Sequence, residues 1–318
     1  MNSTPASVLV IDDFHPSFVK QLEASGLQVN YKPDFSPKSD LSLLNSAEII
    51  AVRSKLNFTS KILSDLPNLK CIARGGAGMD NIDEEYARKN NIVLLNAPEG
   101  NRDAVAEHTI GLLLNISNKI NQSFDEVKSG QWNREANRGW EIGGKTIGIV
   151  GFGNTGTALA KKLSGFDANV VAYDKYKSID SPYAEEIDLE EMLKTADVIS
   201  FHVPLTAETQ GMVNTELIEQ MKAGVVLINT SRGGICKLSD VQLGIISGKI
   251  KSFGTDVLEN ENLGSWTEKE RQVVNDLISS NQVLITPHVA GWTFESYHKI
   301  ADVLALKIIE YTTKAKNI

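Results

Sequence analysis

In Thr146-Ile-Gly-Ile-Val-Gly-Phe-Gly-Asn-Thr-Gly-Thr-Ala-Leu-Ala160, an apolar run leads into a glycine-rich turn and then into a helical pattern. The apolar residues predict a buried strand, and the small and apolar residues after the turn predict a helix. The spacing G-x-G-x-x-G lets Gly151 form a tight turn, Gly153 admit a pyrophosphate and Gly156 pack helix against strand. Since it lies between a strand and a helix, the turn predicts a dinucleotide-binding unit.

Short apolar runs rich in β-branched residues recur along the chain, with longer amphipathic stretches between them. Alternation of this kind predicts an α/β fold with helices on both faces of a parallel sheet. The runs form two sets, so we expect two Rossmann-like parallel-sheet domains. The first set is Val8–Ile11, Ile49–Val52, Leu69–Ala73 and Ile92–Leu95, and the second is Thr146–Val150, Val170–Tyr173, Val198–His202, Val225–Asn229, Ser252–Thr255 and Val283–Thr286.

The two sets are joined by Asn96-Ala-Pro-Glu-Gly-Asn101, whose residue types are typical of a turn. We expect a bridging helix from about Asn101 to Lys119, with Asn101 as its N-cap. Its apolar face comprises Val105, Thr109, Leu112, Leu113 and Ile116. A C-terminal helical pattern, which can return to the first domain, contains Ile300, Val303, Leu304, Ile308 and Tyr311.

The composition of the 318 residues fits an enzyme of two domains, with 42% hydrophobic and 23% charged residues. A net charge of -8 disfavours nucleic acid or an anionic membrane as the main partner. Cys71 and Cys236 lie beside apolar runs, which is typical of buried reduced thiols in a cytoplasmic protein. Residues 1–7 lack the basic start of a signal peptide, and no apolar run is long enough for a membrane span, so we expect neither.

The strand after the glycine turn ends in Val170-Val-Ala-Tyr-Asp174, which places an acidic residue 23 positions after Gly151. A carboxylate at this point accepts hydrogen bonds from the adenosine ribose of a dinucleotide and would repel a 2′-phosphate. The sequence therefore favours NAD over NADP as the cofactor. The alternative is a surface aspartate that follows a tight strand–helix turn.

Three later segments carry charged residues after a predicted strand, where ligands bind in open α/β sheets. The guanidinium of Arg232 can fork onto a carboxylate and polarise the adjacent carbonyl. Glu259 and Glu261 follow the next strand, and His288 follows the last. A carboxylate beside His288 would favour its protonated form, which can give a proton to a substrate. Each residue alone could be a surface or structural group, but together they predict carbonyl reduction.

The remaining histidines do not form a recognisable metal motif, because no H-E-x-x-H or C-x-x-C spacing occurs. We therefore expect no metal site. His108 and His298 fall within helical patterns and are interpreted as packing or surface groups. His202 ends a strand, where it either has a structural role or borders the nicotinamide.

Seven ordered segments, spread over almost the whole chain, resemble the D-isomer-specific 2-hydroxyacid dehydrogenases. The resemblance implies NAD-dependent hydride transfer at the 2-position of a small D-2-hydroxy acid. It implies that Arg232 binds substrate, that His288 is the acid/base, and that Glu261, rather than Glu259, orients and charges the histidine. The segments are Arg74-Gly-Gly-Ala-Gly-Met-Asp-Asn81, Asn96-Ala-Pro-Glu-Gly-Asn-Arg-Asp-Ala-Val-Ala-Glu107, the glycine turn with Asp174, His202-Val-Pro-Leu205, Asn229-Thr-Ser-Arg-Gly-Gly234, Asp256-Val-Leu-Glu-Asn-Glu261 and Thr286-Pro-His288.

The family also implies a cofactor domain, residues 100–287, inserted into a flavodoxin-like substrate domain, residues 1–99 completed by 288–318. The cleft between them closes on substrate, and dimers form through the cofactor domains. The implied cofactor contacts are Gly151, Gly153, Asn154, Thr155, Gly156, Asp174, His202, Pro204, Thr230 and Asp256. The implied substrate contacts are Arg53, Ser54, Arg74, Gly75, Gly76, Ala77, Gly78 and Arg134.

Within the family, the N-terminal half is most similar to 3-phosphoglycerate dehydrogenase, an enzyme of serine biosynthesis. The segment Val52-Arg-Ser-Lys-Leu56 resembles its substrate loop, and Arg74 and Arg134 match positions where that enzyme gathers positive charge near a phosphate. Such a cluster would create a local anion site in an acidic protein. Alternatively, Arg53 binds a carboxylate and Arg134 is a surface residue. The glycine-rich loop after Arg74 can present N–H groups to the substrate carboxylate.

Departures from the family pattern leave the acid open. Asn262 stands where a proline often follows the glutamate, the stretch from Glu261 to His288 is long, and Trp292 replaces a small residue. Hydroxypyruvate, glyoxylate and D-lactate therefore remain alternative substrates, and an NAD-sensing corepressor of the same fold is a remote alternative. Because the chain ends near residue 318, we expect no C-terminal regulatory domain.

Overall fold

A computed structural model describes residues 7–38 and 40–315 of the chain. The chain divides into two compact units, unit 1 (Met1–Asn101 and Trp292–Ile318) and unit 2 (Arg102–Gly291). Each unit is built on a parallel sheet with helices, so the predicted fold class is confirmed. The sequence places the two boundaries two and four residues earlier. The first six residues, which bear on the signal-peptide expectation, lie outside the described residues.

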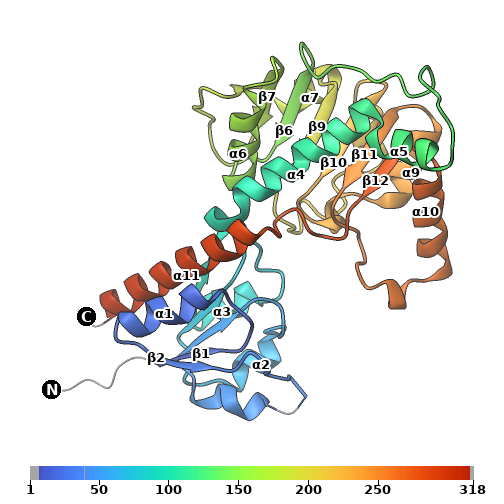
Figure 1. Cartoon of the computed structure of the whole chain (residues 1–318). Helices are drawn as coiled ribbons and strands as arrows, with labels where there is room; N and C mark the ends of the chain where they lie inside the picture. The colour runs from blue at the N-terminus through green and yellow to red at the C-terminus, as the bar shows by residue number, and fades with distance from the viewer. Residues whose placement is uncertain (1–6, 39, 316–318) are drawn as a thin grey trace. The chain divides into compact units, whose positions relative to one another are not determined.

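Unit 1 contains a five-stranded sheet in the order β2-β1-β3-β4-β5. Its strands are β1 (Ser7–Val10), β2 (Gln28–Tyr31), β3 (Ile49–Val52), β4 (Cys71–Arg74) and β5 (Val93–Asn96). Figure 1 shows α1 (Pro16–Ala24) and α11 (Phe294–Ala315) side by side, and their apolar residues pack on one face of the sheet. The other face packs against η1 (Leu41–Ser46), α2 (Ser60–Ser64) and α3 (Glu84–Lys89).

Unit 2 contains a seven-stranded sheet in the order β12-β11-β10-β9-β6-β7-β8. Its strands are β6 (Thr146–Val150), β7 (Asn169–Tyr173), β8 (Glu185–Glu186), β9 (Val198–Phe201), β10 (Val225–Asn229), β11 (Ile250–Thr255) and β12 (Val283–Ile285). Its helical segments are α4 (Pro98–Asn118), whose first turn belongs to unit 1, α5 (Ile120–Lys128), α6 (Asn154–Leu163), α7 (Leu189–Thr195), α8 (Thr215–Gln220), η2 (Gly233–Ile235), α9 (Leu238–Ile246), η3 (Leu263–Ser265) and α10 (Glu268–Ser279).

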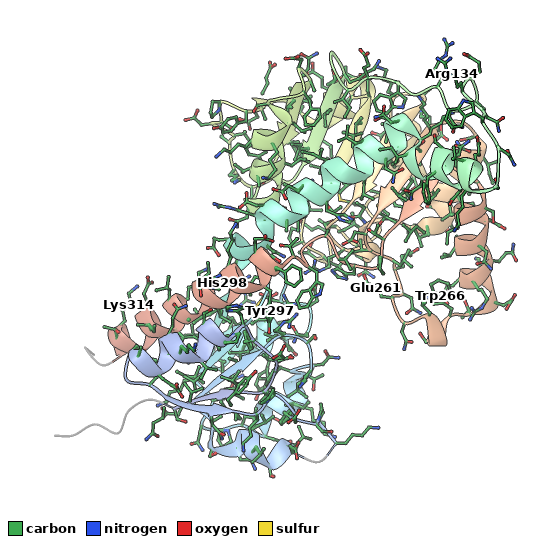
Figure 2. All side chains as sticks on the ribbon, in the orientation of Figure 1. Arg134, Glu261, Trp266, Tyr297, His298 and Lys314 are labelled. Atoms are coloured by element: carbon green, nitrogen blue, oxygen red, sulfur yellow. The ribbon has the colours of Figure 1, made fainter. Side chains whose placement is uncertain are left out.

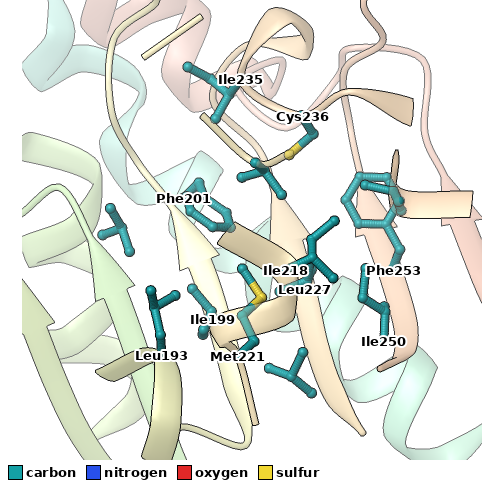
Figure 3. Packing of buried hydrophobic residues seen from close by; sticks show 14 of the residues in the cluster. Leu193, Ile199, Phe201, Ile218, Met221, Leu227, Ile235, Cys236, Ile250 and Phe253 are labelled. Carbon is teal, nitrogen blue, oxygen red and sulfur yellow. The ribbon is translucent and has the colours of Figure 1, made fainter. Parts of the chain in front are cut away.

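The inner strand β10 is buried on both faces, because its side chains alternate between two apolar layers. Val226 and Ile228 pack with residues of α4 and α6. Val225 and Leu227 pack on the opposite face with residues of α7 to α10, and Figure 3 shows Leu227 among Ile218, Met221 and other members of this layer. Burial on both faces explains why the sequence of β10 is a continuous apolar run.

Three elements differ from the expectation. α4 begins at Pro98, because proline is pre-organised for the first turn of a helix, and the prediction that Asn101 is the N-cap is wrong. β2 and β8 were not predicted from the sequence, because both are edge strands with little apolar character. In the described part of the chain, no helix has the length and apolar character that a membrane crossing requires.

Because the strands of each sheet are parallel, their carboxyl ends lie along the same side of the sheet, which we call its carboxyl edge. In unit 2 this edge carries the residues that follow β6, β9, β10, β11 and β12. In unit 1 it carries the residues that follow β1, β3 and β4. Most of the candidate functional residues lie at these two edges.

Candidate active site

The glycine turn after β6 is shaped by close backbone contacts. Gly151 has φ +93°, and a Cβ there would lie 2.7 Å from the carbonyl oxygen of His202. A Cβ on Gly156 would collide with the carbonyl oxygen of Gly151, so only glycine allows α6 to begin so close to the strand. Gly153 is the N-cap of α6 and has open space around it. The first turn of α6 can therefore offer its N–H groups to a phosphate.

Asp174 lies beside this turn at the end of β7. One carboxylate oxygen accepts a hydrogen bond from Phe152 N at 2.9 Å, and the other accepts one from Tyr176 N at 3.1 Å. Both bonds fix the carboxylate where a dinucleotide ribose binds in folds of this kind. Asn154 and Thr155 form the first turn of α6, next to this position.

His202 follows β9 and is 8% exposed. Its Nε2 lies 2.8 Å from Ser200 Oγ, whereas its Nδ1 is buried and has no hydrogen-bond partner among the described residues. Burial lowers the pKa of His202 to about 4, so the ring is neutral near pH 7. A buried polar atom without a partner is costly, and a ligand group at this edge would satisfy it. The residues present thus fit a bound dinucleotide.

The structure brings Glu261 and His288 together. His288 Nδ1 lies 2.8 Å from Glu261 Oε2, and both side chains are about half exposed. Glu259 lies elsewhere: its carboxylate accepts a hydrogen bond of 2.8 Å from Leu238 N at the start of α9. Partial desolvation raises the pKa of Glu259. Of the two glutamates in this segment, Glu261 is the one that contacts the histidine.

The loop that carries His288 is held by Asp256, which is 1% exposed. The Asp256 carboxylate accepts hydrogen bonds from Val289 N at 2.9 Å, Ala290 N at 2.7 Å and Thr286 Oγ1 at 2.5 Å. His288 has φ +55°, a left-handed conformation that is uncommon for residues other than glycine and clusters at functional sites. Asp256 was predicted from the sequence only as a cofactor contact, and that role stays a prediction.

His108 contributes to the same network. Its Nε2 lies 2.9 Å from Thr286 Oγ1 and 3.6 Å from the Asp256 carboxylate. From the sequence it is interpreted as a packing or surface group. Its helical spacing gave no signal of this contact, because α4 and the segment after β12 meet only in the folded chain.

Arg232 lies in the turn after β10, next to the strand that precedes Glu261. Asn229 shapes this turn: its side-chain amide donates to Arg232 O at 2.9 Å, and its side-chain oxygen accepts from Ser231 N at 3.1 Å. Thr230, an expected cofactor contact, shares a 2.9 Å hydrogen bond with Thr109 of α4. Pro204, another expected contact, lies in the exposed segment after His202.

Unit 1 presents two loops at the carboxyl edge of its sheet. The Asp12 carboxylate accepts the backbone N–H groups of Arg53, Ser54 and Lys55 at 2.9, 2.8 and 3.1 Å, which fixes the first loop. In the second loop, Gly76 has φ +155°, and a Cβ there would collide with the guanidinium of Arg74. The remainder of this predicted substrate loop is Gly75, Ala77 and Gly78.

Arg134 does not lie with the catalytic candidates of unit 2. It is exposed in the segment after α5, and Figure 2 shows Arg134 and Glu261 at opposite ends of this unit. Trp140, later in the same segment, stacks on Lys251 near the amino end of β11. The segment thus lies toward the edge opposite the carboxyl ends of the strands. The expected contact of Arg134 with substrate has no support within unit 2.

Among the described residues, no group of three or more His, Cys, Asp and Glu side chains could hold a metal ion. Both cysteines are free and buried, and burial raises the pKa of Cys71 to about 12. Neither thiol is suited to act as a nucleophile, because the thiolate is strongly disfavoured.

Known proteins are similar to this chain in sequence and in fold. The family model described as D-isomer specific 2-hydroxyacid dehydrogenase, NAD binding domain, matches residues 110–290. A hydroxypyruvate reductase of Thermotoga maritima is 35% identical over 85% of this chain and 86% of that protein. A D-3-phosphoglycerate dehydrogenase of Archaeoglobus fulgidus is 34% identical over 95% of this chain, which spans only 56% of that protein. A D-lactate dehydrogenase of Aquifex aeolicus, solved with NAD and lactic acid, has a TM-score of 0.84 and 28% identity, with 97% and 96% of the two chains covered.

Proposed function

Because the chain belongs to the D-isomer-specific 2-hydroxyacid dehydrogenase family and carries its NAD binding domain, we propose that it interconverts a small D-2-hydroxy acid and the corresponding 2-keto acid with NAD(H). The 2.8 Å hydrogen bond between His288 and Glu261 carries this proposal. A histidine beside a carboxylate at the ligand-binding edge of the sheet is suited to give and take the proton of a carbonyl reduction. Unit 2 is then the cofactor domain and unit 1 the substrate domain.

The chemistry follows from the orientation of the His288 ring. When bound, NADH supplies the hydride for the 2-carbon of the keto acid. Since Nδ1 faces Glu261, the protonated ring gives its proton to the 2-keto oxygen from Nε2. Glu261 orients the ring through its hydrogen bond to Nδ1, and Arg232 binds the substrate carboxylate and stabilises the developing alkoxide. Oxidation of the hydroxy acid uses the same groups in reverse.

The preferred acid in this proposal is 3-phosphohydroxypyruvate, with 3-phosphoglycerate as its reduced form, which would place the enzyme in serine biosynthesis. Arg53 and Arg74 at the carboxyl edge of the unit 1 sheet support an anionic substrate. Similarity to a phosphoglycerate dehydrogenase over 95% of the chain supports this acid.

Hydroxypyruvate is the second candidate. The reductase from Thermotoga maritima matches this chain over 86% of its own length, whereas the phosphoglycerate dehydrogenase is much longer than the matched part.

Steady-state oxidation of NADH with the two acids side by side tests both candidates. We expect kcat/KM to be higher for 3-phosphohydroxypyruvate, and Arg53→Ala to reduce this preference. Arg134→Ala tests whether that residue contributes at all. Equal or better use of hydroxypyruvate would overturn the phosphorylated substrate. Absence of NADH oxidation with every 2-keto acid would overturn the proposed activity.

The assembly that we propose is a homodimer through unit 2. Ile120, Phe124 and Val127 share one face of α5 and are 52%, 64% and 51% exposed, and the nearby Trp132 is 79% exposed. An exposed apolar stripe of this kind is typical of an interaction surface. Light scattering should report a dimer that Phe124→Glu converts to a monomer. A cytoplasmic location, supported by the two free buried cysteines, is part of the same proposal.

A further inference from the structure

Arg53 lies against two aromatic rings, that of Trp292 just before α11 and that of Tyr297 within α11. Its guanidinium carbon is 4.4 Å from the ring centroid of Trp292 and 5.4 Å from that of Tyr297. The two rings meet edge to face at 5.5 Å between centroids. All three residues belong to unit 1, so the cluster is complete within that unit. Stacking of this kind fixes the plane of a guanidinium.

The polar partner of the Arg53 guanidinium is a backbone carbonyl and not a carboxylate. Arg53 Nη1 donates to the carbonyl oxygen of Asp13 at 3.2 Å. The Asp13 carboxylate instead accepts hydrogen bonds from the hydroxyls of Tyr297 at 2.8 Å and Tyr31 at 3.2 Å. Within the described ranges 7–38 and 40–315, no carboxylate forms an ion pair with Arg53. The guanidinium is therefore held in place by neutral groups.

Two other cations of unit 1, Lys70 and Lys307, are held differently. Lys70 lies 2.6 Å from Glu48, and Lys307 lies 2.9 Å from Glu99, so both charges are compensated by carboxylates. The backbone of the Arg53 loop is also fixed, through the three N–H groups that Asp12 accepts. A fixed guanidinium without an ion-pair partner is suited to bind a carboxylate or a phosphate from outside the chain.

We propose that Trp292, Tyr297 and Asp13 are positioning residues that hold Arg53 ready for an acid group of the substrate. This inference rests on the proposed function and adds the residues that set affinity for the anion. Trp292 and Tyr297 fix the plane of the guanidinium, and Asp13 fixes the Tyr297 hydroxyl. Because the acid/base pair His288–Glu261 belongs to unit 2, these residues act on substrate binding rather than on proton transfer.

The test is steady-state kinetics at saturating NADH, with the 2-keto acid as the varied substrate. The variants are Trp292→Ala, Trp292→Phe and the matched control Phe294→Ala. Phe294 is an aromatic residue two positions away and 94% exposed. We expect Trp292→Ala to raise KM about fivefold, the scale of one cation–π contact, with kcat within about twofold. Trp292→Phe keeps a ring face for the guanidinium and should restore most of the affinity, and Phe294→Ala should leave both constants unchanged.

A double-variant experiment separates positioning from a general structural effect. In an Arg53→Ala background, Trp292→Ala should raise KM no further, because the group it positions is gone. If the rise in KM occurs with both 3-phosphohydroxypyruvate and hydroxypyruvate, Arg53 binds the shared carboxylate; if it occurs only with the former, Arg53 binds the phosphate. An equal rise with and without Arg53, or no rise in Trp292→Ala, would overturn the inference.

A calorimetric titration of the protein and NAD⁺ with 3-phosphohydroxypyruvate measures binding without turnover. It therefore tests this inference separately from the proposed activity. We expect weaker binding in Trp292→Ala than in Phe294→Ala, whether or not the wild-type protein turns the acid over. Equal binding by these two variants, or absence of binding by the wild type, contradicts the inference. Lack of turnover together with this difference in binding contradicts only the proposed activity.

Discussion

The loop of Arg53 in unit 1 and the loop of His288 in unit 2 are built alike. Each follows a strand of a parallel sheet, and each is fixed by a buried aspartate that follows the neighbouring strand. Asp12 accepts three backbone N–H groups of the arginine loop, and Asp256 accepts two from the histidine loop. The same arrangement thus fixes the backbone around one candidate functional side chain in each unit.

The two loops differ in the partners of that side chain. His288 has a carboxylate, Glu261, at 2.8 Å, whereas Arg53 has two aromatic rings and a carbonyl oxygen. A paired histidine can hold and release a proton, while an arginine without an ion-pair partner keeps its charge for a ligand. The comparison predicts that changes in the His288 loop act mainly on kcat and changes in the Arg53 loop mainly on KM.

The largest expected effect is that of His288→Ala. Loss of the general acid should lower kcat by about 10²–10⁴-fold, the usual contribution of such a group. NADH binding, followed by fluorescence titration, should persist, because the glycine turn and Asp174 are separate from this loop. If NADH affinity fell as much as turnover, the assignment of His288 to proton transfer would lose its support.

The next effect compares two neighbouring glutamates. Glu261→Gln removes the negative charge beside His288 and should lower kcat by about 10–100-fold, since a hydrogen bond to a charged group contributes about 1.5–3 kcal/mol. Glu259→Gln is the matched control, because Glu259 bonds to Leu238 N and not to the histidine. It should leave kcat within about twofold of the wild type. Similar losses in both variants would falsify the special role of Glu261.

A smaller effect tests Asp12 and Asp256, the buried aspartates that fix the two loops. Asp256→Asn and Asp12→Asn should each lower the free energy of unfolding by about 1–3 kcal/mol, because buried hydrogen bonds to a charged acceptor are weakened. Their kinetic effects should differ: Asp256→Asn should lower kcat, and Asp12→Asn should raise KM. Urea unfolding and steady-state kinetics on the same preparations measure both. If the two variants changed the same kinetic constant, the division of roles between the two loops would be wrong.

The sequence predicted the parts of unit 2 that lie in continuous patterns. Each of the candidate groups follows an apolar strand, so its position can be predicted from a single segment of the sequence. These groups are the glycine turn, Asp174, Arg232, Glu261 and His288. The residues that hold these groups in place could not be predicted in the same way. Asp12 and Asp13 contact residues 41 and 284 positions away, and His108 contacts Thr286 across 178 positions. Such contacts are set by the packing of distant strands and helices, which no local pattern encodes.

Trp292 illustrates the same limit in unit 1. Its type was visible in the sequence as a departure from the family pattern, but its stacking on Arg53 depends on α11 packing beside α1. Arg134 is a second example, because a local resemblance predicts its contact with substrate, whereas within unit 2 it lies far from Glu261 and its role stays a prediction. A motif match gives the residue type, whereas the contacts of that residue depend on the fold around it.

The smallest expected effect distinguishes the two histidines that follow strands of unit 2. His288 is about half exposed and paired with Glu261, whereas His202 is buried, and burial lowers its pKa to about 4. An unfolded chain binds a proton at histidine near pH 6.5, so between about pH 6.5 and pH 4 the unfolded state holds a proton that folded His202 does not. The contribution of His202 to stability is therefore complete above pH 6.5 and is lost as the pH falls.

From pH 7.5 to pH 5.5, this linkage should lower the free energy of unfolding by about 1 kcal/mol. His202→Gln keeps a polar side chain without the titration, so the wild type should lose about 1 kcal/mol more than the variant over this range in urea unfolding. A histidine NMR signal that does not shift above about pH 5 would identify the same group directly. Equal pH dependence in the two proteins would mean that His202 takes up a proton in the folded state, and that its ring is open to water rather than enclosed beside the glycine turn.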